Sequence, residues 1–558
     1  MGPGKKVMRR RGWMWIVVTC IAILSTISVA FAEPVTDFED ITADIGRGFG
    51  SGLNHYSWSS STFSYDNNIY IGTFNVNLDI HAIPEYIQQI GAADGPLAAL
   101  APLDAFRRLW SGSPITASTG GEIWRYDTTA HSWGSAPVLK TGSEDVGFRK
   151  MIEFDGYLYG GTANGPNGPA PGDPKYSVRP PFSPVPPDPT VSYAGSGTAL
   201  YRSHDGLTWT EVPGGPSLNP YNSSNRAMEV IGGKLYLGTE NVFGPELWSF
   251  DGTTWTPIIG PGGLAPGTLA VGEIAEFRGK TYVGTWGGGS GGHAYRLLEL
   301  NGGPPVDVTP NYPDNGDSGV MQLINYNGKF LLGTVNYTGG FSLLETTDPT
   351  DPNSWNVVTL DGFGTEYPSM GGSSANAYSW SSQEVGGVLY LGTFNTNKPN
   401  SWLDQLLGTD VPLDGRGQIW YTEDGSHWKI LEDNGFDSIF TYGFRTMTQY
   451  DNRLVVGSAS NMFLPDLFST PYGIEFLSGL LDSEDFDLEL IARLLDSKKL
   501  DLRQFTRLFD IEGGFGSHFP YIGTQVFVSG PASVPEPSTL FLLASGLLGL
   551  AGLKRKKS

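Results

Sequence analysis

Cysteine is almost absent from this chain, because Cys20 is the only one in 558 residues. Histidine is also scarce, and the seven histidines lie singly, without the i, i+2 or i, i+4 partner that a metal site would show. A disulfide framework, a thiol nucleophile and a cysteine-ligated metal are therefore excluded once the N-terminal segment is removed. We expect no metal and no cofactor.

Catalytic motifs are missing as well. The chain has no Gly-x-Ser-x-Gly sequence, no phosphate-binding loop and no carboxylate pair that stands out among its 57 acidic residues. The sequence therefore predicts no catalytic residue.

Positive charge is in short supply, with 35 Lys and Arg against 57 Asp and Glu and a formal net charge of −22. Such a chain is repelled by nucleic acid and by anionic lipid headgroups, so we expect no nucleic-acid partner. Glycine (76), tyrosine (25) and tryptophan (15) are plentiful instead. A composition rich in turns and aromatic residues is typical of all-β repeat folds.

The N-terminus carries an export signal. Five cations between Lys5 and Arg11 precede an apolar stretch from Trp13 to Ala30, which ends in the small-x-small sequence Ala30-Phe31-Ala32. We predict that residues 1–32 form a signal peptide and that the mature chain begins at Glu33. A lipoprotein signal at Cys20 is the alternative, but the apolar run continues past that residue.

The C-terminus has three parts. Pro535-Glu536-Pro537 holds the chain extended, because proline fixes φ and lacks an N–H. An apolar run without a polar stripe follows, and we predict a transmembrane helix over residues 538–553 that places the chain transiently in the inner membrane. Its length, roughly 24 Å against the ~30 Å hydrocarbon core, by itself favours a helix packed on the domain. The final cluster, which stops transfer, is Lys554, Arg555, Lys556 and Lys557.

Residues 531–558 closely resemble the PEP-CTERM sorting signal of Gram-negative bacteria. The resemblance implies cleavage near the Pro-Glu-Pro motif by an exosortase in bacteria that make exopolysaccharide. It also implies an exported protein, first tethered to the inner membrane and then placed at the cell surface or in the extracellular biofilm matrix.

One motif occurs seven times. Each copy has an apolar residue, a turn containing Gly or Asn, and an alternating strand that ends in Gly-Thr or Gly-Ser, as in Phe154–Thr162. A second hairpin, usually with a tryptophan, follows most copies, so each repeat predicts a four-stranded sheet. We therefore predict a seven-bladed β-propeller over residues 33–530. The repeat glycines are Gly72, Gly161, Gly238, Gly284, Gly333, Gly392 and Gly457.

Two insertions, near 84–110 and 478–510, are predicted to be helical. In the seventh repeat, Gly473–Phe476 is expected as the third strand. The fourth strand comes either from Tyr521–Ser529 or from the mature N-terminus, which would lock the ring.

The repeats resemble kelch and galactose-oxidase-type propellers, in which the second strand ends in paired glycines and the fourth begins at Trp. This chain mostly has Gly-Thr instead, and galactose-oxidase chemistry is excluded because that family's cofactor needs a cysteine joined to a tyrosine. The Asp-Gly-x-x-Trp turns also resemble the Asp-box of sialidases, but they are one residue shorter.

One group of residues is a candidate binding site. Counting twelve positions back from the repeat glycine gives Arg149, Arg226 and Arg445. Three guanidinium groups at one channel mouth predict a site for a carboxylate or sulfate, whereas arginines paired with acids of neighbouring blades would be structural. Trp58 and Trp380 lie in a sequence shared by repeats one and six. These two rings either stack on sugars or pack between blades.

Three functions fit these observations. The favoured one is a non-catalytic surface or matrix protein that binds polysaccharide or protein through the propeller. The second is an exported glycan-active enzyme, such as a lyase or a sialidase-like hydrolase, which uses the arginines to hold an acidic sugar. The third is a purely structural component of the envelope.

Overall fold

The computed structural model describes residues 33–78, 116–164, 197–395, 416–460 and 523–532, apart from gaps of one to five residues inside these ranges. The predicted signal peptide, both predicted helical insertions and the sorting helix lie outside the described residues. Inside them the chain forms strands and three short 3₁₀ helices, η1 (Arg47–Gly50), η3 (Gly215–Leu218) and η4 (Gly362–Gly364). The prediction of an all-β chain is confirmed for this part.

Long antiparallel hairpins form the frame of the described structure. Their turns use the residues that the sequence motif predicted: Asp155 and Gly156, for example, have φ of 50° and 72°, as a tight hairpin turn requires. The seven hairpins in the described residues are β2 (Asn54–Phe63) with β3 (Asn68–Asn75), β9 (Asp145–Phe154) with β10 (Tyr157–Asn164), β13 (Ser224–Ile231) with β14 (Lys234–Glu240), β17 (Thr268–Phe277) with β18 (Lys280–Gly287), β21 (Gly319–Tyr326) with β22 (Lys329–Val335), β27 (Asn376–Val385) with β28 (Val388–Asn395), and β31 (Thr441–Tyr450) with β32 (Arg453–Ser460).

Outer strands extend each hairpin into a sheet, and we number the resulting units 1 to 7 in the order of the hairpins. The outer strands, in the same order, are β6 (Glu122–Asp127) with β7 (Ser132–Trp133) and β8 (Leu139–Lys140), β11 (Leu200–Ser203) with β12 (Trp209–Glu211), β15 (Leu247–Phe250) with β16 (Trp255–Ile259), β19 (Leu297–Leu300) with β20 (Val306–Asp307), β23 (Leu343–Thr346) with β24 (Asn356–Thr359), β29 (Ile419–Thr422) with β30 (Trp428–Glu432), and β33 (Val526–Val528) with β1 (Glu39–Asp40). Two small ribbons, β4 (Asn77–Leu78) with β5 (Thr116–Ala117) and β25 (Glu366–Tyr367) with β26 (Ser373–Ser374), stand apart from these sheets.

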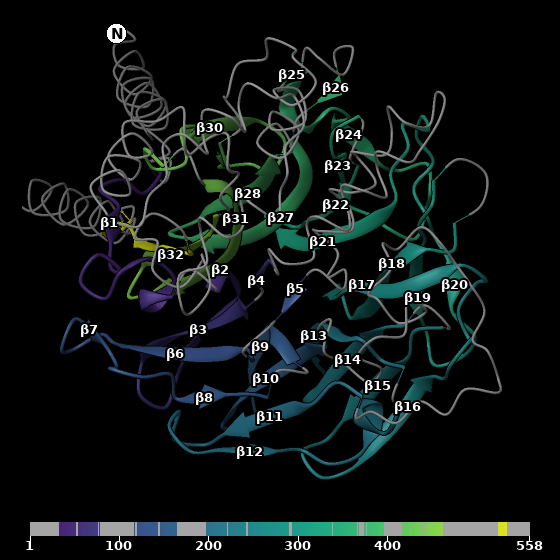
Figure 1. Cartoon of the computed structure of the whole chain (residues 1–558). Helices are drawn as coiled ribbons and strands as arrows, with labels where there is room; N and C mark the ends of the chain where they lie inside the picture. Colours follow the sequence, from purple (N-terminus) through teal and green to yellow (C-terminus); the bar gives the residue numbers. More distant parts are fainter. Residues whose placement is uncertain are drawn as a thin grey trace, which may run out of the picture.

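The hairpins join into a closed ring. The second strand of each hairpin pairs with the first strand of the next one, as Phe74 pairs with Gly147 between units 1 and 2. The pairing of Tyr56 with Ala459 joins unit 1 to unit 7 and closes an antiparallel ring of fourteen strands. The first strands of the hairpins lie innermost, each in contact with the next, and the sheets spread outward from them (Figure 1).

Unit 7 is built from both ends of the described chain. Its third strand is β33, where Val526 pairs with Gly457, and its fourth is β1, where Asp40 pairs with Phe527. The expectation that Gly473–Phe476 supplies the third strand is therefore wrong, and that segment lies outside the described residues. The sequence could not decide between a C-terminal and an N-terminal closing strand, and the structure uses both.

The Gly-Thr motif has the same role in every unit. The side-chain oxygen of Thr162 accepts a hydrogen bond of 2.9 Å from the backbone N–H of Ala199, which leads into the third strand. The equivalent bonds in the other units are accepted by Thr73, Thr239, Thr285, Thr334, Thr393 and Ser458. The preceding glycine leaves room for the next unit: a Cβ at Gly72 would lie 2.4 Å from Ser59 Oγ and 2.7 Å from Phe148 Cβ.

Apolar side chains fill the spaces between adjacent sheets. Phe154 and Tyr159 of unit 2, for example, pack against Leu235, Leu237 and Phe250 of unit 3, and all five are buried. Burying side chains of this kind contributes roughly 1.5–3 kcal/mol each. The core is thus divided among the contacts between neighbouring units rather than gathered in one place.

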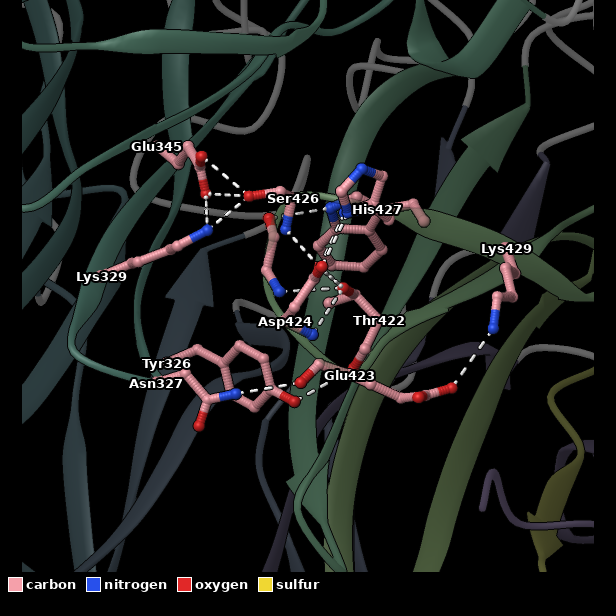
Figure 2. Close-up of polar contacts among 12 residues, drawn as sticks. Tyr326, Asn327, Lys329, Glu345, Thr422, Glu423, Asp424, Ser426, His427 and Lys429 are labelled. Atoms are coloured by element: carbon pink, nitrogen blue, oxygen red, sulfur yellow. Dashed lines mark hydrogen bonds and ion pairs between the residues drawn. The ribbon is translucent and has the colours of Figure 1, made fainter. Parts of the chain in front are cut away.

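The Asp-Gly turns join neighbouring units. Asp424 Oδ1 accepts the N–H groups of Ser426 and His427, both at 2.8 Å, which fixes the turn between β29 and β30 of unit 6 (Figure 2). Ser426 then contacts Glu345 of unit 5, its hydroxyl donating at 2.8 Å. Tyr326 of unit 5 donates to the carbonyl of Thr422 at 3.1 Å.

The turn of unit 2 packs on unit 1 in a similar way, because a Cβ at Gly206 would lie 1.8 Å from the Tyr70 hydroxyl. Backbone N–H groups lower the pKa of Asp205, in the same turn, to about 2. These turns serve as contacts between units.

Candidate functional site

One β-bulge recurs in the first strand of every hairpin. In unit 2, Phe148 pairs with Thr162 and Lys150 pairs with Gly161, so Arg149 is left without a partner on the opposite strand. A bulge leaves one residue out of the ladder and re-aims its side chain. We call the residues at this register the central layer, and in chain order they are Trp58, Arg149, Arg226, Gly272, Met321, Trp380 and Arg445.

The central layer contains all five residues that the sequence analysis singled out. Counting back twelve positions from the repeat glycine reaches every member except Trp58, which lies fourteen positions before Gly72. The difference comes from the first hairpin, which has a four-residue connection, Ser64–Asn67, where the hairpin of unit 2 has two residues. The longer turn hides the equivalence of Trp58 with the arginines, whereas Trp380 keeps the spacing of twelve residues.

Two arginines of the layer lie over tryptophans of the preceding unit. The guanidinium carbon of Arg149 is 4.8 Å from the centroid of the Trp58 ring, and that of Arg445 is 5.6 Å from Trp380. Only 6% of Trp58 and 4% of Trp380 is exposed. The two rings therefore provide flat supports for guanidinium groups, and their stacking on a sugar stays a prediction.

The backbone around these two bulges is held by a serine. Ser59 Oγ donates to the carbonyl of Phe148 at 2.8 Å, and Ser381 Oγ donates to the carbonyl of Phe444 at 2.9 Å. Each hydrogen bond reaches from one unit to the residue just before the bulge of the next. The bulged arginines are thus fixed by two equivalent inter-unit contacts.

Arg226 differs from the other two arginines. Its Nη1 is 2.9 Å from Glu240 Oε2, and only 4% of its side chain is exposed. Its guanidinium carbon lies 3.9 Å from the centroid of the Trp286 ring. Trp286 reaches this place because unit 4 has Gly272 in the central layer, where a Cβ would lie 2.8 Å from Cδ1 of the ring. Arg226 therefore has an acidic partner, in its own unit.

Arg149 and Arg445 have no acidic partner within the part of the chain that the structure describes. Arg445 donates to the carbonyl of Trp380 at 3.3 Å, and the buried Nε of Arg149 has no hydrogen-bond acceptor. Burial, followed by the charge of Arg226, lowers the pKa of Arg149 to about 9, and the charge of Arg445 adds to this effect. Burial also lowers the pKa of Arg445 to about 10. Both side chains stay cationic at neutral pH.

An acid–base cluster, which the sequence analysis missed, lies beyond the bulges on the first strands of units 2, 3 and 4. Lys150 of unit 2 is 2.9 Å from Glu273 of unit 4, and both follow directly after a central-layer residue. Glu229 lies on the strand of unit 3 between them, and burial, followed by the charge of Glu273, raises its pKa to about 7. Lys150 and Glu273 directly follow bulge residues, which was the only available signal for them, whereas Glu229 lies three residues after Arg226.

Among the described residues, no group of His, Cys, Asp and Glu could hold a metal ion. No helix within the same ranges is both long and apolar enough to cross a membrane.

Residues 533–556 match the PEP-CTERM protein-sorting motif. This match includes Pro535–Pro537 and Lys554–Lys556, and it confirms the sorting signal that the sequence predicted. The signal indicates an exported protein that is processed at the membrane, with an exosortase as its processing partner. No curated protein matches the chain.

Solved structures from several organisms align with parts of this chain. An α-L-arabinofuranosidase of Clostridium thermocellum aligns with 50% of this chain and 92% of its own, at 15% identity and a TM-score of 0.27. A Trypanosoma rangeli sialidase bound to the inhibitor DANA aligns with 59% of this chain and 56% of its own, at 14% identity and a TM-score of 0.34. A Dyadobacter fermentans protein of unknown function aligns with 56% of this chain and 89% of its own, at 12% identity and a TM-score of 0.33. The resemblance to kelch propellers stays a prediction.

Proposed function

We propose that the chain is an exported seven-bladed β-propeller, with units 1 to 7 as its blades, that binds an acidic polysaccharide at its centre without catalysis. The closed ring of fourteen strands and the seven equivalent Gly-Thr or Gly-Ser hydrogen bonds support the propeller. The sorting motif supports export and processing. The destination in this proposal is the cell surface or the extracellular matrix.

A single observation carries the proposed binding site: Arg149 and Arg445 are half-buried cations without a carboxylate partner among the described residues. A charge removed from water is costly unless it is paired. The chain as a whole is strongly acidic, and Arg226 at the same register has Glu240 as its partner. A ligand carboxylate or sulfate would complete the site through the bidentate geometry of arginine.

Affinity chromatography tests this function. The purified full chain should be retained on an acidic polysaccharide such as polygalacturonate and pass through a neutral dextran column. Retention should weaken as salt rises, because the contact is electrostatic. Failure to retain the chain on any acidic polysaccharide would overturn the proposal. Retention that Arg149→Gln and Arg445→Gln leave unchanged would make both arginines structural and place the ligand elsewhere.

A glycan-active enzyme is the second candidate function. It is favoured by Glu229, a carboxyl group whose pKa burial raises to about 7, near Glu273 and Lys150. A carboxyl group with a pKa close to neutral can donate a proton in catalysis. Size analysis of the bound polysaccharide decides between the candidates: shortened products that disappear in Glu229→Gln support an enzyme, and an unchanged chain length supports a binding protein.

A further inference from the structure

Units 6 and 7 repeat units 1 and 2 in sequence. Units 1 and 6 share Asn-x-Tyr-Ser-Trp-Ser-Ser, beginning at Asn54 and Asn376. Units 2 and 7 share Gly-Phe-Arg-x-Met, beginning at Gly147 and Gly443. The other units lack both sequences. The chain thus contains a two-unit block twice, and each block places one tryptophan and one arginine in the central layer.

Ring closure brings the two blocks side by side. Unit 7 joins unit 1 through Tyr56 and Ala459, so units 6, 7, 1 and 2 are consecutive around the ring. The central-layer residues therefore follow one another in the order Trp380, Arg445, Trp58, Arg149. Tryptophan and arginine alternate over these four of the seven central-layer positions.

The contacts inside the two blocks are equivalent. Trp58 packs over Gly147, where a Cβ would lie 2.7 Å from Cε3 of the ring, and Trp380 packs over Gly443, where a Cβ would lie 2.6 Å from Cζ3. Each ring supports the arginine of the next unit, and each arginine lacks an acidic partner among the described residues. Arg226 belongs to neither block and is paired with Glu240.

We propose that each tryptophan–arginine pair is one half of a two-part anion site, and that its ligand carries two carboxylate groups on one molecule, as two linked uronic acid residues do. One carboxylate binds Arg149 and the other binds Arg445. This inference rests on the proposed function and makes it more specific.

Electrostatics favours this stoichiometry. Besides burial, the charge of Arg226 and, to a smaller extent, that of Arg445 lower the pKa of Arg149, while Glu240 opposes them. Burial and the charge of Arg226 also lower the pKa of Arg445, so the cations of the central layer repel one another in the absence of a ligand. One carboxylate offsets one of the two charges, whereas a molecule with two carboxylates offsets both and holds the second group near its arginine once the first is bound. The charge of Arg226 is already offset by Glu240, so a ligand carboxylate would stabilise that guanidinium less.

Titration calorimetry on the full chain tests the proposal with three probes: digalacturonate with two carboxylates, galacturonate with one, and neutral galactobiose. Digalacturonate should bind at least about tenfold more tightly than galacturonate, and galactobiose should not bind. Arg149→Gln and Arg445→Gln should each weaken digalacturonate binding by about 10- to 100-fold, to a similar extent, because each removes one charge-assisted contact. The remaining affinity should approach that for galacturonate.

Arg202→Gln is the matched control. Arg202 also lies over an aromatic ring, at 4.7 Å from the centroid of Tyr157, but on an outer strand of unit 2, and its replacement should leave binding unchanged. Thermal melts establish that each variant is folded. If a glutamine variant fails to fold, Arg149→Lys and Arg445→Lys replace it in the test. Lysine keeps the charge but loses the bidentate geometry, so each lysine variant should weaken digalacturonate binding about tenfold.

Two results would overturn the two-part site and leave the proposed function intact. One is equal affinity for digalacturonate and galacturonate. The other is a loss confined to one of the two arginine variants. Absence of binding to every acidic probe, with no retention on polygalacturonate, would overturn the proposed function itself.

Discussion

Arg226 lies 3.9 Å from the centroid of the Trp286 ring, in a place that exists because unit 4 has a glycine in the central layer. With Glu240 at 2.9 Å, this arginine is held by one ring and one carboxylate. Arg149 and Arg445 have the ring but no carboxylate partner among the residues that the structure describes. Three arginines at the same register therefore have two different environments.

Replacing Glu240 should destabilise the fold. Glu240→Gln leaves a buried guanidinium without its counter-charge, and we expect a loss of about 1–3 kcal/mol in the free energy of unfolding, measured by urea denaturation. Glu423→Gln is the control, because Glu423 pairs at 3.3 Å with Lys429, whose side chain is 62% exposed. That change should cost less than about 1 kcal/mol. Equal urea midpoints for the two variants would contradict a structural role for Arg226.

Glu229 should make stability depend on pH. Its pKa is raised from 4.5 to about 7 in the folded state by burial, then by the charge of Glu273, with Glu276 adding to the rise and Lys150 opposing it. Between these two pKa values the folded chain binds more protons than the unfolded chain, so the contribution of Glu229 to stability falls as pH rises from about 5 to 8. Glu229→Gln should remove this pH-dependent contribution to stability.

The quantity to compare is the difference in the free energy of unfolding between variant and parent. Burial lowers the pKa of His55 to about 4, so the contribution of His55 to stability rises with pH over part of the same range. Relative to the parent, Glu229→Gln should gain about 1–3 kcal/mol in the free energy of unfolding between pH 5 and pH 8. Glu211→Gln, on the exposed end of β12, should give no such change. A constant difference for Glu229→Gln would show that this carboxyl group is ionised in the fold throughout the range.

Removing the N-terminal strand should open unit 7. A chain that begins at residue 43 loses β1, the buried side chain of Val35 and the 2.6 Å hydrogen bond from Gln525 to Asp40. We expect a loss of about 3–5 kcal/mol in the free energy of unfolding, from one buried apolar side chain and several hydrogen bonds. A chain that begins at Val35 should unfold like the mature protein. Similar melting temperatures for both truncations would mean that β33 closes the unit by itself.

Processing should remove both ends of the chain. Export is expected to cut after Ala32, and the exosortase is expected to cut near Pro535–Pro537 on the outer side of the membrane. Mass spectrometry of the protein recovered outside the cell checks both positions. Lys554–Lys557 on that protein would contradict C-terminal processing, and an N-terminus before Glu33 would contradict the predicted signal peptide.

Local features of the fold could be predicted from the sequence, because turn residues and strand alternation act over a few positions. The hairpin at Asp155-Gly156 and the Gly-Thr ends of the second strands are of this kind. The repeat also places Arg149, Arg226 and Arg445 at one register, since equal spacing from the repeat glycine means equal positions in the ladder.

Long-range features could not be predicted in this way. The third strand of unit 7 follows Ser458 by more than sixty residues, and its hydrogen bond to Ser458 leaves no local pattern. The place of Arg226 depends on Trp286, whose ring fits against Gly272, and no spacing rule describes this packing. The shared register of Trp58 and the arginines was hidden by two extra residues in the first hairpin turn.

The two ends of the described chain meet in unit 7, and this has a mechanical consequence. Strand β33 is hydrogen-bonded on one side to β32 and on the other to β1, and the sorting segment follows it. If the sorting segment tethers the protein to the membrane as predicted, a pull applied along β33 loads both ladders in shear, where the hydrogen bonds resist together rather than opening one by one. Unit 7 is thus held by two ladders next to the sorting segment, and a cut beyond Ala532 would leave both ladders intact.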